Sequence, residues 1–309
     1  MTQRWAYLGP EGTFTEQAVM ELRAAEPDDV ELEPSFSVAT AIADLRAGRV
    51  AGACVPIENS VEGAVPLTLD ELTHGQPLMI SAEAYVTVQL DLLVRPGTTL
   101  ADIRKVGSHP HGHAQVRGFV TTTLPDAESV VFSSTAAAAA AVADGELEAA
   151  AAAPAAGRRY RLESLALDIG EVHGAVTRFV LLRLPGVPVP RTGNDKTSLV
   201  VYVQDEPGSL LAVLAELANR GINLTRLESR PARSAVGKYF FLLDADGHLD
   251  DPAMADAIAA LHRRSAGLRF LGSYPRGIGT AHTPPAFASP AAFADASAFV
   301  KGLVTGAGQ

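Results

Sequence analysis

Short apolar runs alternate with helix-like segments along the first half of the chain. The runs are rich in β-branched and aromatic residues, which favour strands. Several of the segments open on a Ser or Thr that can cap a helix. In chain order the pattern predicts a strand over 4–8, helices over 17–22 and 39–47, strands over 51–56, 78–84, 86–94 and 130–132, and a helix over 136–143. Strands that alternate with helices are typical of an α/β fold.

A second pattern follows residues 184–196, whose prolines and glycines are typical of an interdomain linker. It predicts a strand over 197–203, a helix from Pro207 to Leu217, strands over 222–230 and 238–244, a helix over 252–264 and a strand over 268–274. This βαββαβ order is typical of a ferredoxin-like domain. In the tail, 276–309, Ser289 and Pro290 favour a short helix bearing Phe293 and Phe299, and disorder is the equal alternative.

The composition narrows the class of protein. With 309 residues, 47% of them hydrophobic and 19% charged, the chain is expected to form two or three globular domains. Its net charge of −10 argues against nucleic-acid binding, because neutralising phosphates requires a basic face. The single cysteine, Cys54, excludes an internal disulfide, and its apolar neighbours indicate a buried thiol. No leader or bilayer-spanning run is present, so we expect a cytoplasmic protein without a membrane partner.

Polar residues stand at the leading edge of an apolar run that starts at Val176. Thr177 offers a hydroxyl, and Arg178 offers a planar fork that matches a carboxylate. At the start of a rigid strand, the two side chains are suited to bind an anion and to donate or accept a proton. The alternative is that Thr177 caps a turn and Arg178 is solvated.

A second polar group follows the strand predicted over 51–56. Glu58, Asn59 and Ser60 supply an acid, an amide and a hydroxyl, and Gly63 permits close approach of the backbone. Ligands of α/β sheets collect beyond the carboxyl ends of strands. The alternative is that Asn59 and Ser60 cap a helix while Glu58 is solvated.

Histidines at alternate positions, His109, His111 and His113, form the next unusual run. Such a cluster is a candidate metal site. Pro110 and Gly112 break the regular spacing, and no cysteine accompanies the histidines, so we expect no metal. We expect Ser108 and His109 to end a strand and 111–115 to open a helix.

Several motifs occur in one order, and together they resemble prephenate dehydratase. They are Tyr7-Leu8-Gly9-Pro10-Glu11-Gly12-Thr13-Phe14-Thr15, Pro56-Ile57-Glu58-Asn59-Ser60-Val61-Glu62-Gly63, Ser108-His109-Pro110 with Gln115, and Thr177-Arg178-Phe179. The chain departs from the family pattern at His111-Gly112-His113 and at Ala175, where the family commonly has asparagine.

The resemblance implies an α/β catalytic region over 1–185 that is similar to type II periplasmic binding proteins. Its chain would cross twice between two lobes, with lobe 1 at about 1–76 and 170–185 and lobe 2 at about 77–169. A linker over 186–196, a regulatory domain over 197–275 and a flexible tail over 276–309 would follow. The strand that carries Thr177 would be the returning crossover, which places its start at the cleft.

The resemblance also implies that prephenate loses CO2 and its ring hydroxyl to become phenylpyruvate, with neither a cofactor nor a metal. Thr177, Arg178 and Glu58 are the expected catalytic residues. Thr177 would donate a hydrogen bond to the departing oxygen, with Glu58 or water as a relay. Arg178 would hold the pyruvyl carboxylate, because holding the ring carboxylate would oppose decarboxylation. The expected substrate-binding residues are Thr13, Asn59, Ser60, Ser108, Thr135 and Phe179.

The ferredoxin-like part resembles the ACT domain of the same family, in which phenylalanine binds where two such domains meet. The carriers are Gly208-Ser209-Leu210-Leu211 and Asn223-Leu224-Thr225-Arg226-Leu227-Glu228-Ser229-Arg230-Pro231. The residues expected to bind allosteric phenylalanine are Gly208, Ser209, Leu210, Leu211, Asn223, Leu224, Glu228, Ser229 and Arg230. A homodimer or homotetramer formed through these domains is expected. The alternatives for function are arogenate dehydratase, or an amino-acid-binding sensor without catalysis.

Overall fold

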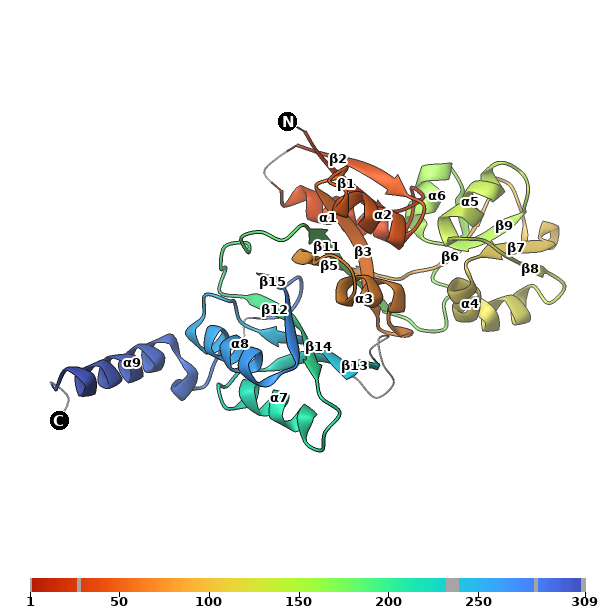
Figure 1. Ribbon diagram of the computed structural model, residues 1–309. Coiled ribbons are helices and arrows are strands. Elements are labelled where there is room, and N and C mark those ends of the chain that lie inside the picture. Colours follow the sequence, from red (N-terminus) through yellow and green to blue (C-terminus); the bar gives the residue numbers. More distant parts are fainter. Residues whose placement is uncertain (1, 27–28, 232–238, 281–282, 307–309) are drawn as a thin grey trace. The chain divides into compact units, whose positions relative to one another are not determined.

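The computed structural model describes residues 2–26, 29–231, 239–280 and 283–306. It divides into two units (Figure 1): the first contains Met1–Glu71 and Ala84–Leu184, and the second contains Leu72–Glu83 and Pro185–Gln309. Each unit has its own sheets and its own core.

The first lobe of the first unit is built on a sheet in the order β2-β1-β3-β11-β5, with β4 paired to β3. Strands β1, β2 and β3 are parallel, and β11 runs antiparallel to β3. The strands are β1 (Gln3–Leu8), β2 (Val30–Ser35), β3 (Gly52–Asn59), β4 (Gly63–Ala64), β5 (Met79–Thr87) and β11 (Val176–Arg183), and the helices are α1 (Phe14–Ala24), α2 (Val38–Arg46) and α3 (Pro66–Thr73).

The second lobe has a five-stranded sheet in the order β10-β6-β9-β7-β8. Its central strand β9 consists of alanines that are all buried, and α5 packs its own alanines against them. Side chains this small let the helix lie close to the sheet. The strands are β6 (Asp91–Val94), β7 (Lys105–Ser108), β8 (Glu128–Val131), β9 (Ala149–Ala152) and β10 (Glu163–Ala166), and the helices are α4 (Pro110–Thr123), α5 (Thr135–Ala143) and α6 (Pro154–Tyr160); a 3₁₀ turn spans Leu100–Asp102.

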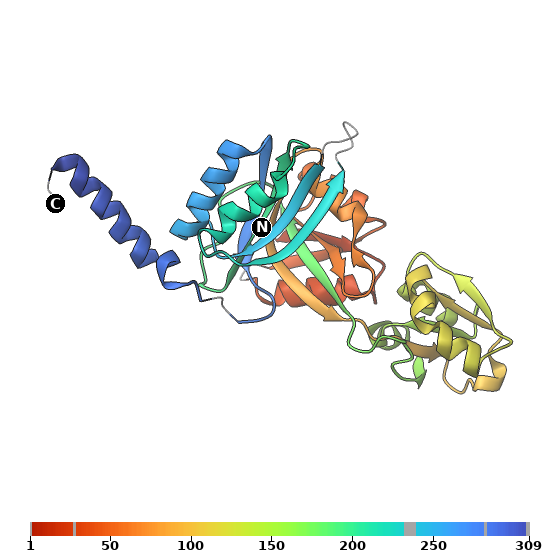
Figure 2. The ribbon, with the colours of Figure 1, turned by 90° about the horizontal axis from the view of Figure 1, so that it is seen from below.

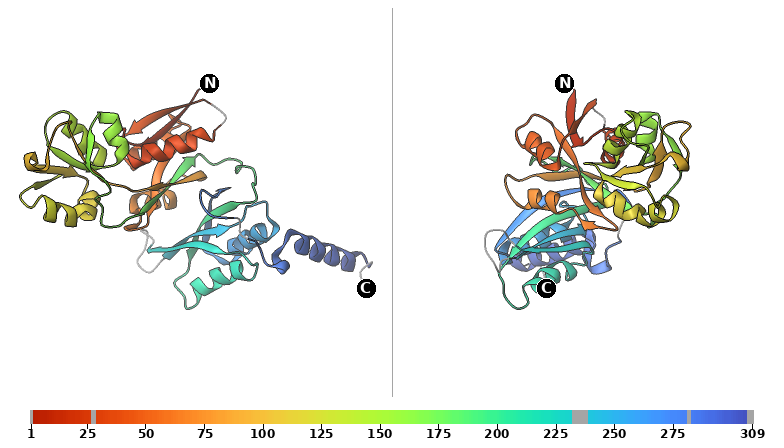
Figure 3. Two further views of the ribbon diagram at one scale, coloured as in Figure 1. Left: turned by 180° about the vertical axis from the view of Figure 1, so that it is seen from behind. Right: turned by 90° about the vertical axis from the view of Figure 1, so that its right-hand side faces the viewer.

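The second unit contains a four-stranded antiparallel sheet in the order β13-β14-β12-β15. With its two helices it has the βαββαβ order expected of a ferredoxin-like domain. The helices lie on one face of the sheet, where Val213, Leu217 and Leu261 pack on strand residues such as Leu199 and Phe241 (Figure 3). The elements are β12 (Asp195–Val203), α7 (Ser209–Ala218), β13 (Leu224–Pro231), β14 (Tyr239–Asp246), α8 (Pro252–Arg264) and β15 (Gly267–Pro275).

Residues 72–83 contact β12 and β15 of this sheet and belong to the same unit. Lys196 of β12 donates to both carboxylate oxygens of Glu83 at 2.9 Å, and their side chains are 5% and 0% exposed. A Cβ at Gly272 would lie 2.3 Å from the carbonyl oxygen of Ile80. Glycine at this position therefore lets the two backbones approach.

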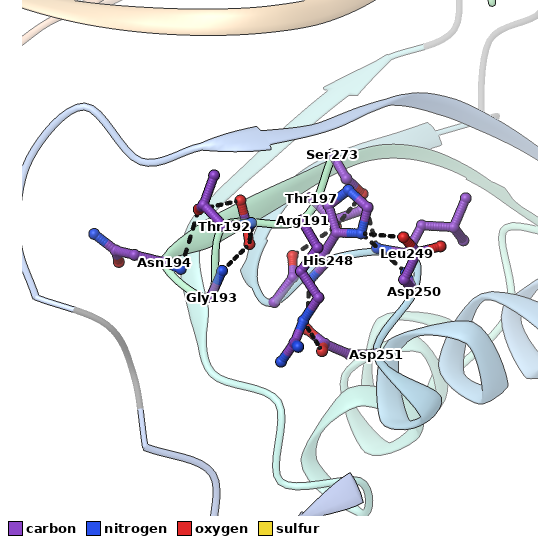
Figure 4. Close-up of polar contacts among 12 residues, drawn as sticks. Arg191, Thr192, Gly193, Asn194, Thr197, His248, Leu249, Asp250, Asp251 and Ser273 are labelled. Carbon is purple, nitrogen blue, oxygen red and sulfur yellow. Dashed lines mark hydrogen bonds and ion pairs between the residues drawn. The ribbon is translucent and has the colours of Figure 1, made fainter. Parts of the chain in front are cut away.

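The segment before β12 is tied to the domain that follows it (Figure 4). His248 is 2% exposed; its Nδ1 accepts a hydrogen bond from the Asp250 N–H, which leaves Nε2–H to donate to the carbonyl of Val189 over 2.9 Å. Arg191 forms an ion pair with Asp251 over 2.6 Å. The predicted linker thus makes specific contacts with the ferredoxin-like domain.

Several predicted elements differ from those observed. The strand predicted over 51–56 continues to Asn59, because β11 and β4 supply partners for the polar residues beyond Pro56. The strands predicted over 78–84 and 86–94 are one long strand, β5, and a short one, β6. Strand β2 and helix α3 were not predicted, and Lys238 lies outside the described residues.

Helix α9 (Pro290–Thr305) follows a 3₁₀ turn at Ala286–Ala288 and resolves the two alternatives for this part of the tail in favour of a helix. Ser289 caps it by accepting a hydrogen bond from the Ala292 N–H, and Pro290 occupies the first turn, where its missing N–H costs nothing.

Replacing Glu83 with Ala would leave the Lys196 ammonium buried without its main partner. We expect the free energy of unfolding to fall by about 3–5 kcal/mol, measured by denaturant titration. The matched control is Glu33→Ala, which breaks the exposed Arg4–Glu33 pair and costs at most about 1 kcal/mol. Equal losses for the two variants would contradict a stabilising role of the buried pair in the native fold.

Candidate active site in the first unit

The antiparallel pairing of β3 and β11 carries all three predicted catalytic residues, Thr177, Arg178 and Glu58. Thr177 lies opposite Asn59, and Arg178 lies opposite Glu58. The Asn59 Nδ2 atom donates a hydrogen bond to Thr177 Oγ1 over 2.8 Å. Since a hydroxyl has one proton and two lone pairs, this bond occupies a lone pair and leaves the proton for another acceptor. Thr177 is therefore oriented as a hydrogen-bond donor.

Arg178 is 3% exposed, so the alternative of a solvated arginine is wrong. One guanidinium nitrogen lies 3.8 Å from Glu58 Oε2, and the Glu58 side chain is 40% exposed. The register shifts between Arg178 and Phe179. Side chains of a strand alternate between faces, and all residues from Thr177 to Leu182 are buried, so both faces of β11 are covered here.

Asn59 and Ser60 shape the turn after β3. The Asn59 Oδ1 atom accepts hydrogen bonds from the N–H groups of Val61 and Glu62, at 2.8 and 3.0 Å. Ser60 exchanges hydrogen bonds with Val176 through its N–H and its Oγ, both at 2.9 Å. The alternative of a helix cap is wrong, because the residues lead into β4. Ser60 instead holds the start of β11, next to Thr177.

Ser108 and Thr135 lie together in the second lobe, where β7, α4 and α5 meet. Ser108 is fully buried and donates to the carbonyl of Ala151 over 2.8 Å. A Cβ at Gly112 would lie 2.3 Å from Ser108 Oγ and 3.2 Å from Thr135 Cγ2. Gly112, which our sequence reasoning missed, is required by this close packing. The only sign of Gly112 in the sequence was that His111-Gly112-His113 differs from the family pattern.

Thr13 caps α1 and lies near a carboxylate of the same helix. Its hydroxyl accepts from the Glu16 N–H and donates to the Leu8 carbonyl, both at 3.2 Å. Glu16 accepts from the Gly12 N–H over 2.6 Å and from the Tyr7 hydroxyl over 3.4 Å. Burial, and then the Glu16 charge, raises the pKa of Tyr7. The carboxylate of Glu16 thus lies against the backbone that leads into this helix start.

A cavity of about 580 Å³ opens between the two lobes of this unit. Tyr160 of α6 spans it by donating to the carbonyl of Glu11 over 3.1 Å, and Arg159 forms an ion pair with the Glu11 carboxylate. Of the predicted residues, Thr13 lines the cavity; Tyr160 was missed because nothing near it in sequence indicated a site. The lining residues are Leu8, Gly9, Pro10, Glu11, Thr13, Thr15, Pro34, Ser35, Phe36, Ser133, Ser134, Ala137 and Tyr160.

The histidine run contacts the turn after β3. His111 Nδ1 lies 3.3 Å from Glu62, and the His109 and His111 rings are stacked with centroids 5.1 Å apart. His113 Nε2 lies 2.9 Å from the carbonyl of Val130. Within the described ranges, no group of three or more His, Cys, Asp or Glu is arranged to hold a metal.

Cys54 is fully buried, and burial raises the pKa of its thiol. A protonated, buried thiol is a poor nucleophile. The prediction of a core cysteine is confirmed.

The residues predicted to bind phenylalanine occupy two parts of the second unit. Gly208 has a positive φ of 86° and caps α7, and it lines a cavity of about 250 Å³ together with Ser209, Glu216 and Arg264. Leu210 packs partly into the core, whereas Leu211 is 70% exposed.

The remaining predicted residues lie in or next to β13, at one edge of the sheet. The Asn223 Nδ2 atom donates to Asp246 over 2.8 Å. Along β13 partly buried positions alternate with exposed ones: Leu224, Glu228 and Arg230 are partly buried, and Ser229 is exposed. An exposed edge strand can pair with another chain.

Comparison with known proteins gives the family. The family model for prephenate dehydratase matches residues 5–186, and the model for the ACT domain matches residues 197–263. The chain belongs to the prephenate dehydratase family. It is 46% identical to the prephenate dehydratase of Amycolatopsis methanolica over 98% of both chains.

Solved structures agree with this family. The prephenate dehydratase of Arthrobacter aurescens in complex with L-Phe has a TM-score of 0.89 and 45% identity, and the match covers 98% of this chain and 99% of that one. GqqA, described as a novel type of quorum quenching acylase, has a TM-score of 0.76 and 33% identity, covering 88% and 98%. Because one fold can support different activities, the activity must be argued from the side chains of the site.

The pKa of His109 provides a test of the packing of the histidines at the start of α4. Desolvation, and then the positive charges of His111 and His113, lowers it below the ordinary value of 6.5. We expect the His109 ring to titrate below 6.5 in NMR spectra of the folded chain. The pKa of His109 is lower in the folded chain than in the unfolded chain, so the unfolded chain binds a proton on His109 more readily. The stability that neutral His109 contributes is therefore present above pH 6.5 and is lost as the pH falls through the pKa of His109 in the folded chain.

The control is His111→Ala, which removes one of the positive charges and should move the His109 pKa back toward 6.5. A His109 pKa at or above 6.5 in the unchanged chain would contradict the packing described for this helix start.

Proposed function

We propose that the chain is a prephenate dehydratase that converts prephenate to phenylpyruvate, CO2 and water in L-phenylalanine biosynthesis. The observation that carries this proposal is the Asn59–Thr177 hydrogen bond, which orients an alcohol as a donor in the strand pair that also sets Arg178 opposite Glu58. Membership of the prephenate dehydratase family supports it. Thr177, Arg178 and Glu58 are the proposed catalytic residues.

The chemistry requires help for the departing hydroxide and control of the carboxylates. Aromatisation supplies the driving force, so a donor that strengthens its hydrogen bond as negative charge develops on the leaving oxygen raises the rate. Thr177 supplies this donor. Glu58, whose side chain is partly exposed, exchanges the proton with Thr177 or with water.

Arg178 is buried beside Glu58, and its side chain is only 4% exposed. We propose that its positive charge attracts the pyruvyl carboxylate, away from the carboxyl group that must leave. Thr13, Asn59, Ser60, Ser108, Thr135 and Phe179 form the proposed surroundings. Of these, Ser60, Ser108 and Phe179 act by packing and hydrogen bonding that hold the strands in place.

We propose that L-phenylalanine regulates the enzyme at the ACT domain. Support comes from the relative that was crystallised with L-Phe and from the exposed groups at two places of this domain. Leu211 is 70% exposed near the positive-φ Gly208, and β13 is an edge strand of its sheet in the part of the chain that the structure describes. Pairing of ACT domains in a homodimer or homotetramer would cover both places.

We also propose a cytoplasmic location. It is supported by Cys54, the only cysteine, which is a free buried thiol. Among the described residues, no helix has the length and hydrophobicity to cross a bilayer.

The proposal is tested by incubating the full chain with prephenate and, separately, with arogenate. Formation of phenylpyruvate from prephenate supports the proposed function, whereas phenylalanine formed faster from arogenate would make the chain an arogenate dehydratase. Binding of amino acids without turnover of either compound would favour a sensor. Repeating the assay with added L-phenylalanine tests the regulation, which is refuted if neither binding nor any change in rate is found.

Replacing Thr177 with Ala should lower kcat by about 10²–10³, the usual effect of losing one donor to a developing charge. KM should change little, because the lost interaction strengthens only in the transition state. The control Thr177→Ser keeps the hydroxyl and should retain most of the activity. Steady-state kinetics with prephenate measure both, and unchanged turnover in the Ala variant would refute the role of Thr177.

Replacing Asn59 with Asp tests the hydrogen bond that orients Thr177 while it keeps the hydrogen bonds that shape the turn after β3. The Asp side chain keeps an acceptor for the N–H groups of Val61 and Glu62, but it cannot donate to Thr177 and would accept that hydroxyl's proton instead. We expect an unfolding midpoint near that of the unchanged chain and a loss of kcat comparable to that of Thr177→Ala. Full activity in Asn59→Asp would show that the hydrogen bond does not orient the donor.

A further inference from the structure

Helix α9 presents an apolar face that its own domain leaves uncovered. It projects away from α8 and the four-stranded sheet in two views (Figures 1 and 2). None of its residues is buried, and Phe299, Val300, Leu303 and Val304 are 63%, 57%, 52% and 83% exposed. The helix lies beyond the residues matched by the ACT family model. Neither the catalytic site nor the proposed phenylalanine site uses it.

The start of α9 is fixed on the ferredoxin-like domain. A Cβ at Gly221, where φ is +65°, would lie 2.5 Å from Pro285 and 2.8 Å from Ala288. These contacts hold the segment before the helix against the turn between α7 and β13. Because an isolated helix of 16 residues is only marginally stable in water, α9 gains most from a partner that covers its apolar face.

The apolar residues of α9 recur at the spacing of one helix face. They are Ala292, Phe293, Ala296, Phe299, Val300, Leu303 and Val304. In the first half Ala292 and Ala296 are small and Phe293 is already partly buried in the single chain, whereas the exposed Phe299, Val300, Leu303 and Val304 make the second half bulky. Two such helices fit best when they run antiparallel, since large residues then meet small ones across the contact.

The charges of α9 favour a second copy over a membrane or an acidic partner. The chain has a net charge of −10, but α9 carries only Asp295 and Lys301 and is neutral. Helices that bind lipid surfaces usually present several Lys or Arg residues on their polar face. A neutral face avoids the repulsion that the rest of this acidic chain would produce between copies.

We propose that α9 packs antiparallel against the α9 helix of a second copy of this chain, with Ala296 of one copy near Phe299 of the other at the centre of the contact. The helix is about 24 Å long, so the contact is short and adds to an interface formed elsewhere between the two copies.

Site-specific cross-linking of the full chain tests this arrangement. Ala296→Cys places a thiol on the apolar face, and its matched control Ala298→Cys places one on the opposite side of the same helix; both positions are exposed in the single chain. Cys54 is buried and supplies no competing thiol. A bis-maleimide with a span of about 10 Å, the separation of packed helix axes, should cross-link Ala296→Cys into dimers and leave Ala298→Cys monomeric on a denaturing gel.

The orientation is tested with the double variant Ala292→Cys/Leu303→Cys. Antiparallel packing brings position 292 of one copy near position 303 of the other, so the double variant should cross-link more than either single variant. No cross-linked dimer from Ala296→Cys, or equal yields from Ala296→Cys and Ala298→Cys, would overturn the proposal. A double variant that behaves like its single variants would overturn the antiparallel arrangement.

Sedimentation gives an independent readout. Val300→Glu/Leu303→Glu should raise the apparent dissociation constant of the assembly about tenfold or more, whereas Ala298→Glu should leave it unchanged. Turnover of prephenate in both variants serves as the check that the chain is folded. Unchanged association in Val300→Glu/Leu303→Glu would overturn the proposal. The proposal would also be overturned if the unchanged chain floated with phosphatidylserine vesicles and the same two substitutions abolished that flotation.

Discussion

The antiparallel register of β3 against β11 is the constraint on which the proposed chemistry depends. It sets Asn59 opposite Thr177 and Glu58 opposite Arg178, although Asn59 and Thr177 lie 118 positions apart in the sequence. A slip by one residue would turn each side chain to the other face of the sheet. The exchange of hydrogen bonds between Ser60 and Val176 fixes the end of this register. Thr177 and Arg178 are buried with most of β11, which lies inside the sheet.

Small residues set how closely the elements around the site approach one another. Gly112 admits Ser108 and Thr135 at the meeting point of β7, α4 and α5, and Gly12 lies against Ala156 of α6. The alanines of β9 and α5 serve the same purpose within the second lobe. Since interiors are packed as densely as organic crystals, one added methyl group at these contacts would displace an element that carries a polar side chain of the site.

The second unit combines a conventional sheet with an unusual polar contact. The helices bury one face of the sheet with apolar side chains, while Lys196 binds Glu83 on β5. Strand β5 continues into Ala84–Leu184 of the first unit and joins β11 in its sheet. A buried ion pair is sensitive to small displacements, because its desolvation is compensated only when the geometry is good.

The sequence by itself determined the family, the α/β class, the ferredoxin-like order of the second unit and the helix start at Ser289, because capping and apolar periodicity are local properties. It also indicated the importance of Thr177 and Arg178. Only the tertiary structure decided that Arg178 is buried against Glu58, that Glu16 fills the start of α1, and that Tyr160 spans the cavity. These outcomes depend on register and on packing between distant segments, and no local pattern of residues encodes which strand or loop will lie opposite.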